Sequence, residues 1–212
     1  MKKITLTNIQ KFLKNVDFKY FFYEKFLLLI GSVYVILNSI LYGKKFKIGK
    51  KYRVWGRIRF LIDGEGKIEI GNRFHAVSSR NRSYITIFSP CHLTSIHGGN
   101  IKIGNHVGLN GNTIVSRKLI KIGDDTMIGP NTMILDSDGH NVAPDKRWGN
   151  SSDAEEIIIE NNCWIGMNCI IMKGVRIGKN SVIGAGSVVV KNCEPNSVYA
   201  GNPAKKIKKI KI

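Results

Sequence analysis

Large aliphatic residues recur at every sixth position between residues 159 and 189. They are Ile159, Ile165, Ile171, Ile177, Ile183 and Val189. Asn or Gly stands three positions after each of the first five, at Asn162, Asn168, Gly174, Asn180 and Gly186. Because Asn and Gly best tolerate a left-handed backbone, each six-residue unit predicts a short strand followed by a corner.

The residue after each corner is compact enough for an inward-facing slot: Cys163, Cys169, Val175, Ser181 and Ser187. An α-helix would need apolar residues spaced by three and four, and a simple strand would need strict alternation, so neither fits. Three such sides make a coil of about eighteen residues, and stacked coils pair their strands at about 4.8 Å. The period predicts an all-β solenoid, a parallel β-helix built from hexapeptide repeats.

The same frame extends upstream, less regularly. It includes Ile103, Leu109 and Val115, then Ile122, Ile128 and Ile134, with Asp125 and Asn131 at corners and weaker traces at Ile68, Ile70, Ile85 and Ile87. These traces indicate that the solenoid starts near residue 60, although the period cannot be counted cleanly there. We expect an N-terminal helical segment over 1–45, the β-helix over 46–192 with a loop insertion at 135–158, and a basic C-terminal tail over 193–212.

The net charge of the chain indicates the kind of partner it binds, and its cysteines indicate the redox compartment. The chain of 212 residues carries 33 basic and 15 acidic residues, a net charge of +18. Such an excess implies an anionic partner, which could be nucleic acid, a membrane surface or a phosphorylated small molecule. Cys91, Cys163, Cys169 and Cys193 lack the paired spacing of metal ligands. We expect them to be reduced, structural thiols, as in a reducing cytoplasm.

The N-terminal segment is apolar and bordered by lysines. Residues 26–42 contain no charge, which is at the lower edge of a membrane-spanning length, while residues 9–23 mix Phe and Tyr with Lys as an interfacial helix would. No small-residue cleavage site follows, which argues against a removable signal peptide. Three interpretations stay open: a helix lying on the membrane, a single short span, or a cap on the solenoid end. The basic flanks favour contact with an anionic cytoplasmic leaflet.

The period breaks between Ile134 and Ile159, and long insertions in compact repeats are usually functional. His140 in this insertion is a candidate general base, because its ordinary pKa lies near neutrality. Asp138 or Asp136 could orient its imidazole. The alternative is a polar turn with a solvated histidine beside it.

Three motifs resemble the hexapeptide-repeat acetyltransferases, especially small sugar O-acetyltransferases: Trp164-Ile165-Gly166, the run from Val182 to Val189, and Ala200-Gly201-Asn202-Pro203-Ala204-Lys205. The resemblance covers roughly residues 100 to 210, and the first sixty residues depart from it. It implies a left-handed parallel β-helix, a homotrimer with sites between neighbouring protomers, acetyl-CoA as co-substrate and no required metal.

The resemblance also assigns roles by position. It makes His140 the base and places Asn110, or alternatively Asn112, at the acceptor, where Arg147 and Trp148 of the insertion are further candidates. The residues matching positions along the cofactor are Trp164, Met167, Gly184, Ala185, Val190, Lys191, Lys205 and Lys208. The family often has Arg in the last two places, and Lys offers only a point charge there.

The expected activity is acetyl transfer to a sugar or glycan hydroxyl in polysaccharide, lipopolysaccharide or capsule biosynthesis, at the inner face of the cytoplasmic membrane. The basic, aromatic N-terminus suggests a lipid-linked or nucleotide-linked acceptor. One alternative is N-acetylation of a nucleotide-linked amino sugar. Another is a zinc carbonic anhydrase using His75, His92, His97 or His106. Nucleic acid is a disfavoured partner, because stacking aromatics do not alternate with basic residues.

Overall fold

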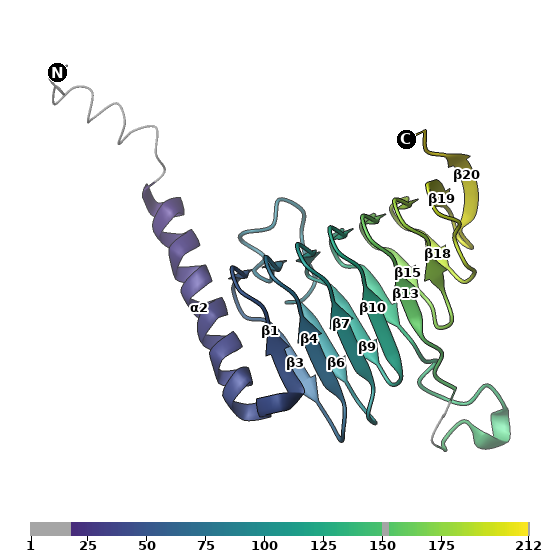
Figure 1. Ribbon diagram of the computed structural model, residues 1–212, viewed down its shortest axis with the longest axis horizontal. Coiled ribbons are helices and arrows are strands. Elements are labelled where there is room, and N and C mark those ends of the chain that lie inside the picture. The colour runs from purple at the N-terminus through teal and green to yellow at the C-terminus, as the bar shows by residue number, and fades with distance from the viewer. Residues whose placement is uncertain (1–17, 150–152, 212) are drawn as a thin grey trace, which may run out of the picture.

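The computed structural model describes residues 18–149 and 153–211. Most of the segment 9–23 that we expect to be interfacial therefore lies outside the described residues. The chain winds into a three-sided solenoid whose coils stack side by side (Figure 1). Three sheets of six, eight and six strands form its sides, and they are parallel except for the last strand. The predicted left-handed parallel β-helix is confirmed.

The strands are distributed evenly over the three sides. Sheet A contains β1 (Phe46–Ile48), β4 (Lys67–Ile70), β7 (Asn100–Ile103), β10 (Leu119–Ile122), β13 (Ile157–Ile159) and β16 (Arg176–Ile177). Sheet B contains β2 (Arg53–Trp55), β5 (His75–Val77), β8 (Gly108–Asn110), β11 (Met127–Ile128), β14 (Trp164–Ile165), β17 (Val182–Ile183), β19 (Ser197–Ala200) and β20 (Lys205–Lys209). Sheet C contains β3 (Arg59–Ile62), β6 (His92–Ser95), β9 (Thr113–Ser116), β12 (Met133–Leu135), β15 (Ile170–Ile171) and β18 (Val188–Val189).

The predicted corners have the predicted backbone. Positive φ angles occur at Asp125, Asn131, Asn162, Asn168, Gly174, Asn180 and Gly186. In the early coils the same conformation is taken by His106 and by Lys51 and Arg73, of which the last two do not favour it intrinsically. The sequence period is hard to count there because the corner residues are atypical, although the coils themselves are regular.

The core consists of the residues that the period selects. The six aliphatic residues from Ile159 to Val189 are at most 1% exposed, and so are the five compact residues beside them. All four cysteines are free and buried, as predicted. Burial raises the pKa of the Cys163 thiol to about 11 and that of Cys193 to about 12, so both thiols stay protonated at neutral pH.

Three details of the expected frame are wrong. Ile114 rather than Val115 faces the core and aligns with Ile134, because the corner at residues 110–112 is shorter than the next one. Ile85 and Ile87 belong to no strand and lie in a loop between β5 and β6. The C-terminal segment is not a loose tail, because it supplies β19 and the antiparallel strand β20.

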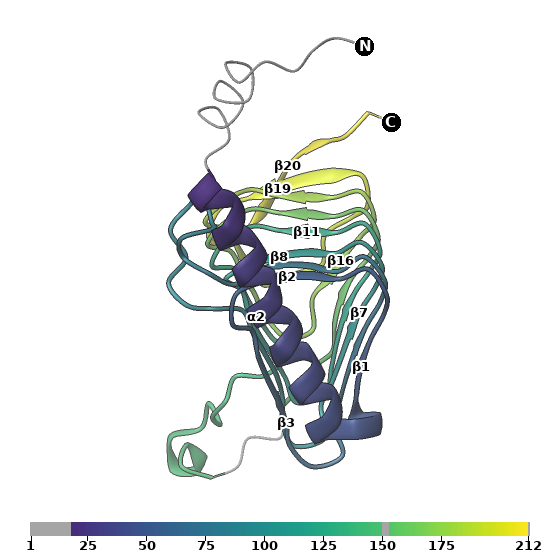
Figure 2. The ribbon, with the colours of Figure 1, turned by 90° about the vertical axis from the view of Figure 1, so that its left-hand side faces the viewer.

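Helix α2 (Phe18–Tyr42) crosses the open end of the solenoid, as Figure 2 shows. A stripe of Leu27, Gly31 and Val35 is buried against the first coil. A Cβ at Gly31 would overlap the Val54 carbonyl oxygen, so only glycine allows this close approach. The short 3₁₀ turn η1 (Gly43–Lys45) then leads into β1. By length and composition the helix could cross a membrane, but its packing is that of the cap.

Candidate active site

The insertion at residues 136–156 is fixed at its base by a buried carboxylate. Asp136 is fully buried and accepts hydrogen bonds from Ser116 Oγ at 2.7 Å and from the backbone N–H groups of Arg117 and Lys118 at 2.7 and 2.9 Å. Its backbone carbonyl accepts from Glu155 N at 2.9 Å. The Asp136 carboxylate therefore anchors the loop, and the prediction that it orients His140 is wrong.

Asp138 holds the stem of the same loop. Its carboxylate lies 2.6 Å from Lys173 Nζ, which also donates to the Asp153 carbonyl at 3.4 Å. The hydrogen bond to Asp138 raises the pKa of Lys173. Lys173 thus joins both sides of the stem to the coil that contains β15, and the Asp138 carboxylate faces this lysine rather than the imidazole.

His140 lies near the tip of the loop, where its Nδ1 is 3.1 Å from the Arg147 carbonyl oxygen. A carbonyl only accepts hydrogen bonds, so this contact requires the proton on Nδ1. The lone pair of a neutral imidazole is then on Nε2. The Arg147 guanidinium donates to the Val142 carbonyl at 3.2 Å, which closes the loop tip on itself. A backbone oxygen therefore performs the orienting role that we assigned to a carboxylate.

The loop tip also presents apolar surface. Trp148 is 95% exposed and Val142 is 74% exposed. The 3₁₀ turn η2 (Pro144–Lys146) lies between them. Neither predicted acceptor residue of the tip, Arg147 or Trp148, contacts the solenoid in the described hydrogen bonds. The tip projects from the body of the molecule (Figure 1).

The two candidate asparagines differ in orientation. Asn112 is fully buried and its amide binds the Gly129 carbonyl and the Asn110 backbone N–H, so it cannot contact an acceptor. Asn110 ends β8 on the outer side of sheet B. Its Oδ1 is buried and has no hydrogen-bond partner among the described residues. A buried acceptor without a partner is unfavourable, so Asn110 needs a donor that the described residues do not supply.

Most predicted cofactor residues lie on sheet B or at its edge with sheet C. Trp164 is 55% exposed and pairs in register with Met127 and Val182. Lys208 lies opposite Val198 and Lys205 opposite Ala200, at the far end of the same sheet. Met167, Gly184 and Ala185 form adjacent corners, so close that a Cβ on Gly166 would overlap the Ala185 backbone.

Val190 and Lys191 lie elsewhere, after β18 at the edge between sheets C and A. The His140 loop leaves the solenoid at that same edge, between β12 and β13. Within one chain the predicted residues therefore form two groups, separated by the width of sheet C. The structure does not bring His140 and Trp164 together in a single protomer.

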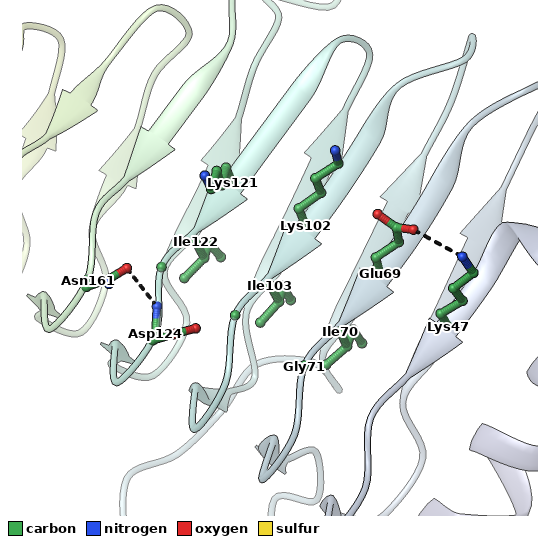
Figure 3. Close-up of a pocket in the computed structure, with 12 residues that line it drawn as sticks. Lys47, Glu69, Ile70, Gly71, Lys102, Ile103, Lys121, Ile122, Asp124 and Asn161 are labelled. Atoms are coloured by element: carbon green, nitrogen blue, oxygen red, sulfur yellow. Dashed lines mark hydrogen bonds and ion pairs between the residues drawn. The ribbon is translucent and has the colours of Figure 1, made fainter.

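Two other features bear on alternatives. Among the described residues, no group of three or more His, Cys, Asp and Glu side chains could hold a metal ion. The ring of His75 on sheet B lies 5.9 Å from that of His106 at the corner before β8, whereas His92 lies on sheet C. A hollow on the outer face of sheet A is lined by Lys102, Lys121 and their neighbours (Figure 3). None of the predicted site residues is among those that line this hollow.

Comparison with known proteins shows what the chain is similar to. Residues 156–191 match the family described as bacterial transferase hexapeptide (six repeats). The galactoside O-acetyltransferase of Escherichia coli (strain K12) is 44% identical over 115 residues, covering 54% of this chain and 56% of that protein. That of Lactococcus lactis subsp. lactis (strain IL1403) is 40% identical over 122 residues, covering 57% and 58%. The chain thus spans just over half the length of the curated relatives it matches.

Solved structures extend the similarity beyond the repeats. A galactoside acetyltransferase in complex with coenzyme A is 28% identical, with a TM-score of 0.55 over 87% of this chain and 80% of that chain. An N-acyltransferase from Bacillus cereus, in complex with coenzyme A and dTDP-4-amino-4,6-dideoxyglucose, shares the fold at 20% identity, with a TM-score of 0.62 over 82% and 90%. The predicted resemblance to hexapeptide-repeat acetyltransferases is confirmed.

Proposed function

We propose that this protein is an acetyl-CoA-dependent O-acetyltransferase that acts on a sugar or glycan hydroxyl, with His140 as the general base. The observation that carries the proposal is the contact of His140 Nδ1 with the Arg147 carbonyl, 3.1 Å away, on a loop inserted into hexapeptide coils. This contact leaves Nε2 free to accept a proton. The similarity to galactoside O-acetyltransferases supports the acetyl donor and the sugar class of acceptor.

The mechanism is direct transfer. Nε2 of His140 removes the proton from the acceptor hydroxyl as its oxygen attacks the thioester carbonyl of acetyl-CoA. The tetrahedral intermediate then collapses, the carbon–sulfur bond breaks, and the imidazolium returns the proton to the leaving thiolate. Backbone N–H groups next to the reacting carbonyl stabilise the oxyanion. Asn110, with its unpaired Oδ1, accepts a hydrogen bond from the acceptor.

The active unit is a homotrimer in this proposal. Support comes from the separation of the predicted residues into two groups on different edges of one chain. The exposed apolar tip with Trp148 on one protomer would face the exposed Trp164 on sheet B of its neighbour. Such a contact would place His140 against the cofactor positions on sheet B and bury apolar surface that a monomer leaves in water. Lys205 and Lys208 would then meet the cofactor phosphates as point charges.

Membrane proximity completes the proposal. The protein would work at the inner face of the cytoplasmic membrane, in the synthesis of a surface polysaccharide, on a lipid-linked or nucleotide-linked glycan. The apolar helix α2 and the net charge of +18 support an anionic membrane as a partner.

The test is acetyl-CoA consumption, followed as free thiol, across a panel of glycans and nucleotide sugars. The His140→Ala variant should lose about 10²- to 10⁴-fold in kcat, while the trimer and coenzyme A binding persist. Asn141→Ala is the matched control in the same loop and should retain activity within a few fold. Near-normal turnover of His140→Ala would refute the assigned base.

The chemistry of the product separates the two acceptor classes. An O-acetyl ester is cleaved by mild alkali or hydroxylamine, whereas an N-acetyl amide resists both. We expect a labile product. A resistant product would instead establish the N-acetyltransferase alternative. The similarity in fold to the Bacillus cereus N-acyltransferase is the reason to test that alternative.

A further inference from the structure

Helix α2 has a second face, opposite the one that packs on the coils. From Phe26 onward its exposed side chains are almost all large and apolar: Phe26, Leu29, Val33, Ile36, Leu37, Ile40 and Leu41, from 44% to 74% exposed. From Phe26 to Tyr42 the helix carries no charge. Soluble surfaces rarely present a continuous apolar row of this length, so the row needs an occupant.

The direction of this face follows from the packing of the opposite one. Leu27, Gly31 and Val35 are buried on the first coil, and α2 contacts β1, β2 and β3. The exposed row therefore points away from the coils, along the solenoid axis. Figures 1 and 2 show the helix lying across the end of the stack, and no other described element lies beyond it.

Charge identifies the occupant as a lipid surface. Lys25 borders the apolar row at one end and Lys44 at the other, and both are exposed. Basic side chains at the margins of an apolar helical face are the pattern of helices that lie in the interface of an anionic bilayer. A transmembrane position is incompatible with the packing, because it would strip the Leu27 stripe from the solenoid and open the core to water.

We propose that the outer face of α2 lies flat on an anionic bilayer, so that the solenoid stands with its axis close to the membrane normal. The face with Leu27, Gly31 and Val35 covers the core of the solenoid, and the opposite apolar face contacts the bilayer. The depth of insertion is limited to the outer half of the helix, since the inner stripe stays on β2.

This orientation fixes the height of the active site, in a step that rests on the function proposed above. The His140 loop leaves after β12, in the fourth coil, three steps of about 4.8 Å beyond the first. The width of α2 adds about 10 Å. The site then stands roughly 25 Å from the bilayer. A lipid-linked acceptor must therefore extend through several sugar units, and a single lipid-linked sugar would not reach it.

Vesicle binding tests the docking face. Wild-type protein should co-sediment with vesicles of phosphatidylcholine and phosphatidylglycerol far more than with phosphatidylcholine alone. Ile36→Glu/Ile40→Glu should reduce this binding by about tenfold or more, with an unchanged melting temperature because both side chains are exposed. Phe88→Glu/Ile207→Glu makes the same charge change at comparably exposed positions away from α2 and from the loop tip, and should bind normally. Equal loss in both double variants would overturn the proposal.

Labels on sheet A test the orientation. The native thiols are buried, so a cysteine introduced at Lys47 or at Lys121 can be labelled alone. These residues lie on the same face, three coils apart. An upright solenoid predicts stronger energy transfer to a lipid dye from position 47. Equal transfer would mean that the basic face of sheet A lies on the membrane (Figure 3), and no transfer from either would exclude docking; both results overturn the proposal.

Acceptor length tests the height independently. On vesicles, acetylation should rise steeply once lipid-anchored glycans exceed a few sugars, while the same short glycans free in solution should be used well. Equal use of short and long anchored glycans would overturn the upright orientation. If no glycan of any length is acetylated while vesicle binding persists, the proposed function fails and the docking surface stands.

Discussion

Two long loops interrupt the coils, and they are built in opposite ways. Residues 78–91 link β5 to β6, and residues 136–156 link β12 to β13. The first loop is held against the solenoid near its end: Ile87 is fully buried, and the Asn131 side chain accepts from Phe88 N at 2.8 Å and donates to the Thr86 carbonyl at 2.9 Å. The second is fixed only at its stem, and its tip is exposed.

The packed loop also joins α2 to the solenoid. The Arg82 guanidinium lies over the rings of Trp55 and Tyr84, at 5.2 and 5.6 Å, and pairs with Glu24 of the helix. Cation–π contacts and an ion pair in a half-buried setting favour a fixed geometry. Loop length alone therefore does not indicate catalysis. The His140 loop differs in two ways: its exposed tip contains an imidazole, and its stem is fixed to the solenoid by Asp136.

The largest effect is expected from removing the buried carboxylate that fixes the base of the His140 loop. Asp136→Ala removes the acceptor of two backbone N–H donors at a buried site, and the Ser116 hydroxyl keeps only the Asn100 carbonyl at 3.0 Å. We expect a loss of about 2–4 kcal/mol in the free energy of unfolding, measured by urea denaturation, together with reduced turnover. Ser137→Ala, one residue along the stem, is the control and should be nearly neutral. A stable Asp136→Ala protein would show that the base does not anchor the loop.

A smaller effect is expected from releasing the packed loop. Asn131→Ala removes both side-chain hydrogen bonds to residues 86 and 88 and also replaces a residue whose φ is 60°. We expect about 1–2 kcal/mol of destabilisation with kcat nearly unchanged. Asn131→Gly separates the two causes, because it relieves the backbone and still lacks the amide. Loss of activity at full stability would contradict the assignment of this loop as structural.

The smallest effect concerns the Asp138–Lys173 pair. Lys173→Met should cost under about 1 kcal/mol, since the pair is partly solvated, and the melting temperature would report it. The pKa of Lys173 is raised in the folded state, so the stabilisation is fully present below the unfolded pKa and is lost as pH rises through the folded one. The difference between wild type and variant should therefore shrink above about pH 10.4. A difference that persists there would exclude the ion pair as its source.

The sequence predicted most where local chemistry decides the structure. Asn162, Asn168 and Asn180 mark corners because few other residues tolerate their φ, and the aliphatic residues between them have only one side to occupy. Lys51 and Arg73 form equivalent corners by tertiary constraint, which no local pattern shows. Ile87 imitates a repeat position while lying in a loop.

The candidate site was predictable only in part, for a similar reason. His140 stands out because the period breaks around it. Its orienting partner is a backbone oxygen of Arg147, and backbone groups carry no sequence signature. The choice between Asn110 and Asn112 depended on which of two nearby amides faces inward, and the short corner between them decides it.

The last strand has a consequence for how these molecules avoid growing into fibres. An uncapped sheet offers its terminal backbone groups to another copy, and parallel coils could in principle polymerise end to end. In sheet B, β20 turns back antiparallel and presents Lys205, Lys206, Lys208 and Lys209, all exposed. A second chain approaching that edge would be repelled by the row of positive charges, which disfavours end-to-end growth into a fibril.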